Sequence, residues 1–150
     1  MTDEADDLKE AEDQVWCDSQ RQYVIDHLSR EGLEHGRVGE WPAWHVSPYV
    51  AIWAIESITH PGWVGWWAIS GDLPTDYVVC GPERTPRAAV REFGLRWKEA
   101  AAVAMAEGRE PDEVVIGRPE DAAMLAPVLG ARAETLLGWA NDDSVWDDDP

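Results

Sequence analysis

The residues with the clearest capacity for chemistry form a turn in mid-chain, Gly71-Asp72-Leu73-Pro74-Thr75-Asp76-Tyr77, directly after an apolar run. The turn gathers two carboxylates, a hydroxyl and a phenol, and paired carboxylates perform acid–base catalysis where burial separates their pKa values. The same residue types are also common turn formers that bond to the local backbone. We therefore take Asp72, Thr75, Asp76 and Tyr77 as candidate binding residues and assign no catalytic residue.

Tryptophan is the second conspicuous feature, because the chain has ten of them and six fall between positions 41 and 67. Indole rings serve both core packing and flat binding platforms, and we expect the tryptophans of the apolar runs to lie in the core. Trp41 and Trp44 differ, since they stand in a proline-containing stretch beside His45. We expect these two rings to be partly exposed and add them to the candidate binding residues.

Metal and nucleophile motifs are weak. His27, Glu31 and His35 have i, i+4 and i+8 spacing, which aligns side chains on one helix face, but Gly32 weakens a helix there. We expect a solvated helix end, no metal site and no cofactor. Cys17 and Cys80 lie far apart without a C-x-x-C motif, which favours two reduced thiols. Known signatures of nucleophilic or nucleotide-binding enzymes are missing from the sequence.

The chain is strongly acidic: its formal net charge is −18, with 30 Asp and Glu against 12 Lys and Arg. Such a surface repels phosphate backbones and anionic lipids, which makes nucleic acid and membranes poor partners and a basic protein a good one. The acidic start lacks the features of a signal peptide, and no apolar run reaches membrane-spanning length, so we expect a cytoplasmic protein. Five basic side chains lie in or beside one predicted helix, and we expect them to pair with the chain's own acids: Arg84, Arg87, Arg91, Arg96 and Lys98.

Hydrophobic periodicity predicts the elements that position these residues. Apolar residues at three-to-four spacing predict three helices, over about 11–30, 86–107 and 119–140. Two β-branched and aromatic runs separated by a Pro-Gly pair predict an antiparallel hairpin, 49–56 with 63–70, followed by a short third strand near 77–80. Residues 32–48 are expected to be a connecting loop. The expected fold class is therefore α+β, with a small antiparallel sheet packed by three helices.

The domain organisation follows from where the charge lies. Acidic runs at both ends predict mobile tails over 1–10 and 147–150, around a single domain over 11–146. The sheet is apolar on both faces, so each face needs a cover. Helices can cover one face, and a loop, a tail or a second copy of the chain the other, which leaves a homo-oligomer possible.

The central run resembles a known family. The stretches 49–57 and 61–77, which include Trp-Trp-Ala-Ile-Ser-Gly-Asp-Leu-Pro-Thr-Asp-Tyr, are similar to the core of a family of bacterial proteins of about this length, domain of unknown function 4826. The ending Gly138-Trp139-Ala140-Asn141-Asp142-Asp143 and Val145-Trp146 is similar too. The resemblance implies a bacterial, soluble, single-domain protein in which the acidic C-terminal stretch docks Trp146. It implies no activity.

Two functions of different classes remain open. The first is a non-enzymatic protein-binding module that presents acidic groups and aromatic anchors to a basic partner, as an inhibitor or immunity-type protein does. The second is a small-molecule-binding domain or enzyme with its site at the Gly71–Tyr77 turn, where Trp41 or Trp44 forms a wall. The missing catalytic signature and the net charge favour the first.

Overall fold

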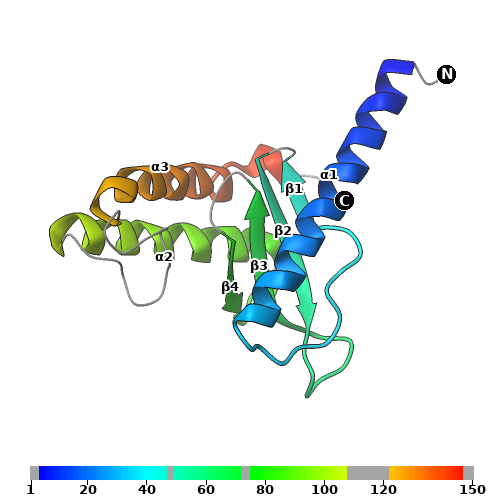
Figure 1. The fold of residues 1–150 in the computed structure, drawn as a ribbon, viewed down its shortest axis with the longest axis horizontal. Helices are drawn as coiled ribbons and strands as arrows, with labels where there is room; N and C mark the ends of the chain where they lie inside the picture. Colours follow the sequence, from blue (N-terminus) through cyan, green and yellow to red (C-terminus); the bar gives the residue numbers. More distant parts are fainter. Residues whose placement is uncertain (1–3, 47–48, 72–74, 108–121, 147–150) are drawn as a thin grey trace. The chain divides into compact units, whose positions relative to one another are not determined.

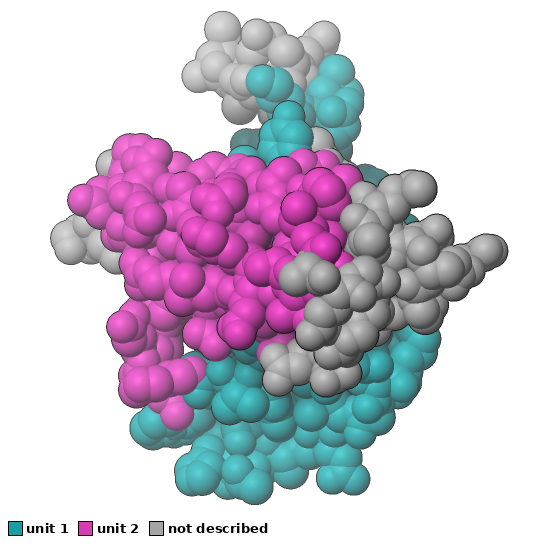
Figure 2. Space-filling model, turned by 90° about the vertical axis from the view of Figure 1, so that its left-hand side faces the viewer, with its two compact units in different colours: residues 1–80 teal, residues 81–150 magenta. Residues whose placement is uncertain are grey.

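The computed structural model describes residues 4–46, 49–71, 75–107 and 122–146. It contains three α-helices and a four-stranded antiparallel sheet, which confirms the predicted α+β class (Figure 1). The chain forms two compact units, residues 1–80 and residues 81–150, which Figure 2 distinguishes by colour. The first unit holds the sheet and one helix, and the second holds the other two helices.

The sheet of the first unit runs in the order β1-β2-β3-β4, with strands Trp44–Val46, Val50–Glu56, Val64–Gly71 and Asp76–Val79. The predicted hairpin is confirmed as β2 and β3, in a register that pairs Ile52 with Ile69 and Trp53 with Ala68. The predicted third strand is β4, one residue earlier than expected. Short β-branched and aromatic runs on either side of a turn were a sufficient signal for these strands.

The prediction that residues 32–48 form only a connecting loop was wrong. Residues 44–46 form the edge strand β1, and Val38 makes an isolated antiparallel bridge with Ile55. The amides of Gly36 and Gly39 donate to the carbonyls of Glu56 and Ala54. The glycines and prolines that suggested irregular backbone therefore belong to a segment that follows the edge of β2, where interrupted pairing is tolerated.

Helix α1, Glu4–Arg30, lies across one face of the sheet (Figure 1). Its buried side is small and apolar and packs with alternate residues of the strands, a cluster that includes Cys17, Val24, Leu28, Ala51, Trp53, Ile55 and Ala68. The intervening strand residues Val50, Ile52 and Ile69 are also buried, as a sheet with two apolar faces requires. These side chains are buried within the single chain, so their burial does not require a second copy, and the possible homo-oligomer through this face stays a prediction.

The predicted helix start near Ala11 was too late. The helix begins at Glu4, and its first turns extend past the sheet (Figure 1), so part of the expected N-terminal tail is helical. Acidic residues suit the positive end of a helix dipole, and the alanines and leucine among them are strong helix formers. Local propensity thus extends the helix beyond the part that packs on the sheet.

Glu56 stabilises both loops that adjoin the end of β2. One carboxylate oxygen accepts from the amide of Gly62 at 2.8 Å and the other from the amide of Arg37 at 3.2 Å. These two backbone hydrogen bonds, the Gly62 bond foremost, lower the pKa of Glu56 below its ordinary value. The hairpin loop and the segment before β1 therefore share one anionic anchor.

The second unit is a helical pair, α2 over Pro86–Glu107 and α3 over Ala122–Ala140. The predicted bounds of α2 are confirmed, and its N-cap is Thr85, whose hydroxyl accepts from the amide of Ala88 at 3.1 Å. Phe93 and Trp97 are fully buried on α2, and Leu129, Ala133 and Leu136 are buried on α3. The predicted start of the last helix at Pro119 lies outside the described residues.

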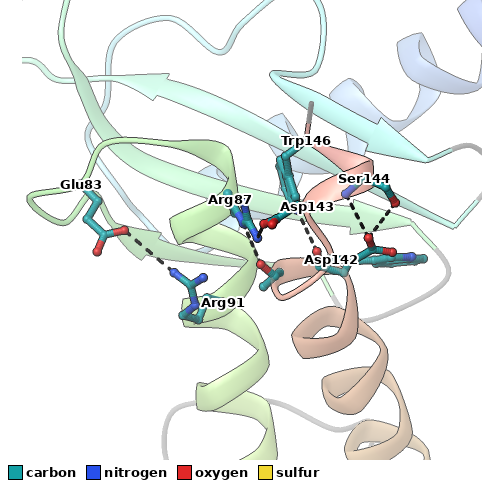
Figure 3. Close-up of polar contacts among 9 residues, drawn as sticks. Glu83, Arg87, Arg91, Asp142, Asp143, Ser144 and Trp146 are labelled. Atoms are coloured by element: carbon teal, nitrogen blue, oxygen red, sulfur yellow. Dashed lines mark hydrogen bonds and ion pairs between the residues drawn. The ribbon is translucent and has the colours of Figure 1, made fainter. Parts of the chain in front are cut away.

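The C-terminal segment returns to α2, and Figure 3 shows the contacts. Arg87 donates to the carbonyl of Ala140 and to the carboxylate of Asp143, both at 2.7 Å, while Arg91 lies 4.0 Å from Glu83. The indole of Trp146 donates to the carbonyl of Trp139 at 2.7 Å, so Trp146 is docked as expected. Part of the basic cluster is thus paired with the chain's own acids, which agrees with the prediction.

Candidate functional site

The predicted turn site is only partly described, because Asp72 lies outside the described residues. Thr75 is half-buried and Asp76 is buried at the start of β4, where its carboxylate accepts from the amide of Tyr77 at 2.8 Å. The half-buried Tyr77 packs against the α1 core and touches the ring of His27 edge-on. Neighbouring residues of a strand point to opposite faces, so Asp76 and Tyr77 do not converge on one ligand. A small-molecule site at this turn stays a prediction.

The two candidate tryptophans, Trp41 and Trp44, also lie in different surroundings. Trp41 is 44% exposed, and its ring meets the imidazole of His45 edge-on, with centroids 5.5 Å apart. Trp44 is half-buried on β1 opposite Ile52, and strand alternation places it on the other face from His45. Of the two predicted aromatic anchors, Trp41 is therefore the more accessible.

His45 is the centre of a polar cluster between α1 and β1. Its Nε2 lies 3.1 and 3.2 Å from the two carboxylate oxygens of Asp13, and its ring stacks on Trp16 with centroids 6.3 Å apart. The Sγ of Cys17, one turn after Asp13, lies 4.0 Å from the Asp13 carboxylate. The ligand atoms of Asp13, Cys17 and His45 all fall within 4.8 Å of one another. We call these three residues the Asp-Cys-His cluster.

The thiol in this cluster is poorly suited to nucleophilic catalysis. Cys17 is 1% exposed, and burial together with the charges of Asp13 and Asp18 raises its pKa to about 11. Since the thiolate is the nucleophile, a buried thiol with this pKa reacts slowly at neutral pH. The side chains of His45 and Asp13 are 21% and 31% exposed, so solvent reaches the cluster from their side.

The histidines that the sequence offered as a metal edge do not form one. Helix α1 ends at Arg30, so Glu31 and His35 lie beyond the helix and do not align with His27 on one helix face. His35 contacts the carbonyl of Gly36, and His60 contacts the Thr59 hydroxyl in the hairpin loop. Both are ordinary local contacts.

Arg21 holds the segment that carries Trp41 and His45 against α1. Its guanidinium donates to the carbonyls of Val38 and Gly39 at 2.9 and 2.8 Å. We expect Arg21→Ala to lower the free energy of unfolding by about 2–3 kcal/mol, because two hydrogen bonds from a charged donor are lost. Urea denaturation checks this against Arg30→Ala, an exposed change on the same helix that should cost less than about 1 kcal/mol. Equal losses in the two variants would contradict the anchoring role.

The exposed side of α1 carries an unusual line of apolar residues. Six exposed side chains follow one another at three-to-four spacing, and we call them the outer face of α1: Leu8, Glu12, Val15, Ser19, Tyr23 and Asp26. Its apolar members Leu8, Val15 and Tyr23 are 63%, 66% and 59% exposed. Single exposed apolar residues are common, but three along one helix line are typical of a contact surface.

Sequence reasoning named neither the Asp-Cys-His cluster nor the outer face of α1. The i, i+4 spacing of Asp13 and Cys17 was visible, but nothing local pairs them with His45, which is brought near only when β1 joins the sheet. The outer face was missed because Val15 and Tyr23 were counted with the apolar stripe of the predicted helix, whereas they are 66% and 59% exposed.

None of the helices in the described ranges is both long and apolar enough to cross a membrane.

Comparison with known proteins identifies a family for this chain and no individual relative. No curated protein and no solved structure matches the chain significantly. The family model described as Domain of unknown function (DUF4826) matches residues 10–146, which span both the sheet and the helical pair. The chain therefore belongs to the DUF4826 family.

Proposed function

We propose that this protein is a non-enzymatic binding module that holds a basic protein partner, in the manner of an inhibitor or immunity-type protein. The observation that carries the proposal is the outer face of α1, where exposed apolar side chains alternate with the polar residues Glu12, Ser19 and Asp26. An amphipathic helix with apolar anchors at such spacing docks into a groove of its partner. We further propose that it acts in the bacterial cytoplasm, where its two free cysteines remain reduced.

Charge supports a basic partner. Helix α1 carries eight Asp and Glu against three Lys and Arg, and the guanidinium of Arg21 is engaged by backbone carbonyls. Acidic groups around apolar anchors attract a cationic surface at long range and repel nucleic acid and anionic lipid. The charge thus selects the class of partner and speeds encounter, while the apolar side chains supply the lasting contact.

Aromatic side chains supply further anchors. Tyr23 lies on the outer face of α1, and Trp41, 44% exposed, lies against His45 beside the same helix. Tyrosine and tryptophan are the residues that most often dominate binding energy at interfaces. We therefore place Tyr23 and Trp41 at the contact with the partner.

The proposal is tested by affinity capture from the native host with the full chain as bait. We expect a stoichiometric basic partner that is released by salt and is captured much less by Glu12→Gln/Asp26→Asn. The control is Glu92→Gln/Glu99→Gln, which removes two exposed acids from α2. Unchanged capture by the α1 variant, or an equal loss in the control, would overturn the assignment of the contact to α1.

A further inference from the structure

We propose that the Asp-Cys-His cluster binds a divalent transition-metal ion, with Zn²⁺ as the best fit, through Asp13, Cys17 and His45. The three ligands include no residue of the outer face of α1, although Trp41, which we place at the partner contact, also packs against His45. Thiolate, imidazole and carboxylate are the three kinds of side-chain ligand that Zn²⁺ takes in proteins.

The distances suit one ion held by three ligands. Bond lengths to zinc of about 2.0–2.3 Å place two N or O ligands about 3.3 Å apart and an S and an O ligand about 3.6 Å apart in a tetrahedron. In the structure the imidazole Nε2 and the Asp13 carboxylate are 3.1 Å apart, and the Cys17 Sγ is 4.0 Å from that carboxylate. The three ligand atoms lie within 4.8 Å of one another, so a modest adjustment of the side chains would bring all three onto one ion.

The supporting structure holds each ligand on an ordered element. Asp13 and Cys17 are one turn apart on α1, and His45 is in β1, where it pairs with Ala51 of the central strand β2. The rings of Trp16 and Trp41 both contact the imidazole, the first stacked and the second edge-on, and these contacts restrict its orientation. Ligands fixed by their surroundings lose little entropy when an ion binds.

The negative charge around the Asp-Cys-His cluster and its access to solvent also suit a metal ion. The carboxylates of Asp13 and Asp18 place negative charge beside the buried thiol, which attracts a cation. The side chains of Asp13 and His45 are partly exposed, so an ion can reach them from solvent, and a water molecule would complete a four-coordinate site. On binding, the thiol proton passes to solvent and the sulfur lone pair bonds the metal.

The test is titration of the reduced, full-length protein with Co²⁺, whose thiolate complexes absorb in the near ultraviolet and, when four-coordinate, strongly in the visible. We expect saturation at one equivalent, displacement of the band by Zn²⁺, and a rise in Tm of about 5 °C or more at saturating Zn²⁺. Cys17→Ser should abolish the charge-transfer band. His45→Asn and Asp13→Asn should weaken binding at least about tenfold.

The matched control is Cys80→Ser, which removes the other cysteine and should leave the band and the stoichiometry unchanged. Far-ultraviolet circular dichroism of each variant separates loss of the site from loss of the fold, and His45→Asn keeps both thiols intact. No band in the wild-type protein, a band that survives Cys17→Ser, or one that disappears in Cys80→Ser would overturn the proposal.

Discussion

Replacing Gly71 with alanine is expected to lower the free energy of unfolding by at least about 3 kcal/mol, because two separate penalties combine. The residue ends β3 with a φ of +135°, a backbone conformation that side chains rarely adopt. A Cβ at this position would also lie 2.3 Å from the carbonyl oxygen of Tyr49, which is backbone and cannot rotate away. Urea denaturation of the two proteins measures the loss directly.

Gly62 is the control that separates the two penalties. It also has a positive φ, +88°, but a Cβ there would meet nothing within 4 Å. Gly62→Ala should therefore cost only about 1 kcal/mol. If Gly71→Ala costs no more than Gly62→Ala, the close approach of β3 to Tyr49 is not a constraint on the fold.

Trp53→Ala is expected to lower the free energy of unfolding by about 3–5 kcal/mol, because the largest side chain of the α1 cluster is removed from a fully buried position. Its indole also donates to the hydroxyl of Ser70 at 3.1 Å on the neighbouring strand, and both residues are 0% exposed. Ser70→Ala leaves that buried donor without its partner and should cost about 1–3 kcal/mol.

Trp63→Ala is the matched control, since the Trp63 side chain is 57% exposed near the hairpin loop. We expect it to change stability by less than about 1 kcal/mol. Comparable losses in Trp53→Ala and Trp63→Ala would mean that the core is not centred where the structure places it.

The elements that could be predicted from the sequence are those whose signal is local. Helix α2 has an N-cap, a proline at its first position and an apolar stripe, and its bounds were predicted without error. The hairpin of β2 and β3 needs only two apolar runs and a turn between them. Strand β1 carries no such signal, because its three residues become a strand only by pairing with β2.

The candidate site residues also divide into those with a local sequence signal and those brought together only by tertiary packing. Trp41 was predicted to be exposed from its proline-containing context, and it is. The Asp-Cys-His cluster joins residues 13 and 45, which are brought together by the packing of α1 on the sheet. Such a pairing depends on tertiary structure, and neither spacing nor composition reports it.

The central claim is that the outer face of α1 binds a basic protein, and calorimetric titration of the purified partner tests it most directly. The wild-type affinity should fall at least about tenfold between 50 and 300 mM salt, and Val15→Ala/Tyr23→Ala should weaken it at least about tenfold at either salt concentration. Leu95→Ala/Met105→Ala, which removes two exposed apolar side chains from α2, should leave it unchanged. An affinity that neither salt nor the α1 substitutions alter would contradict the account.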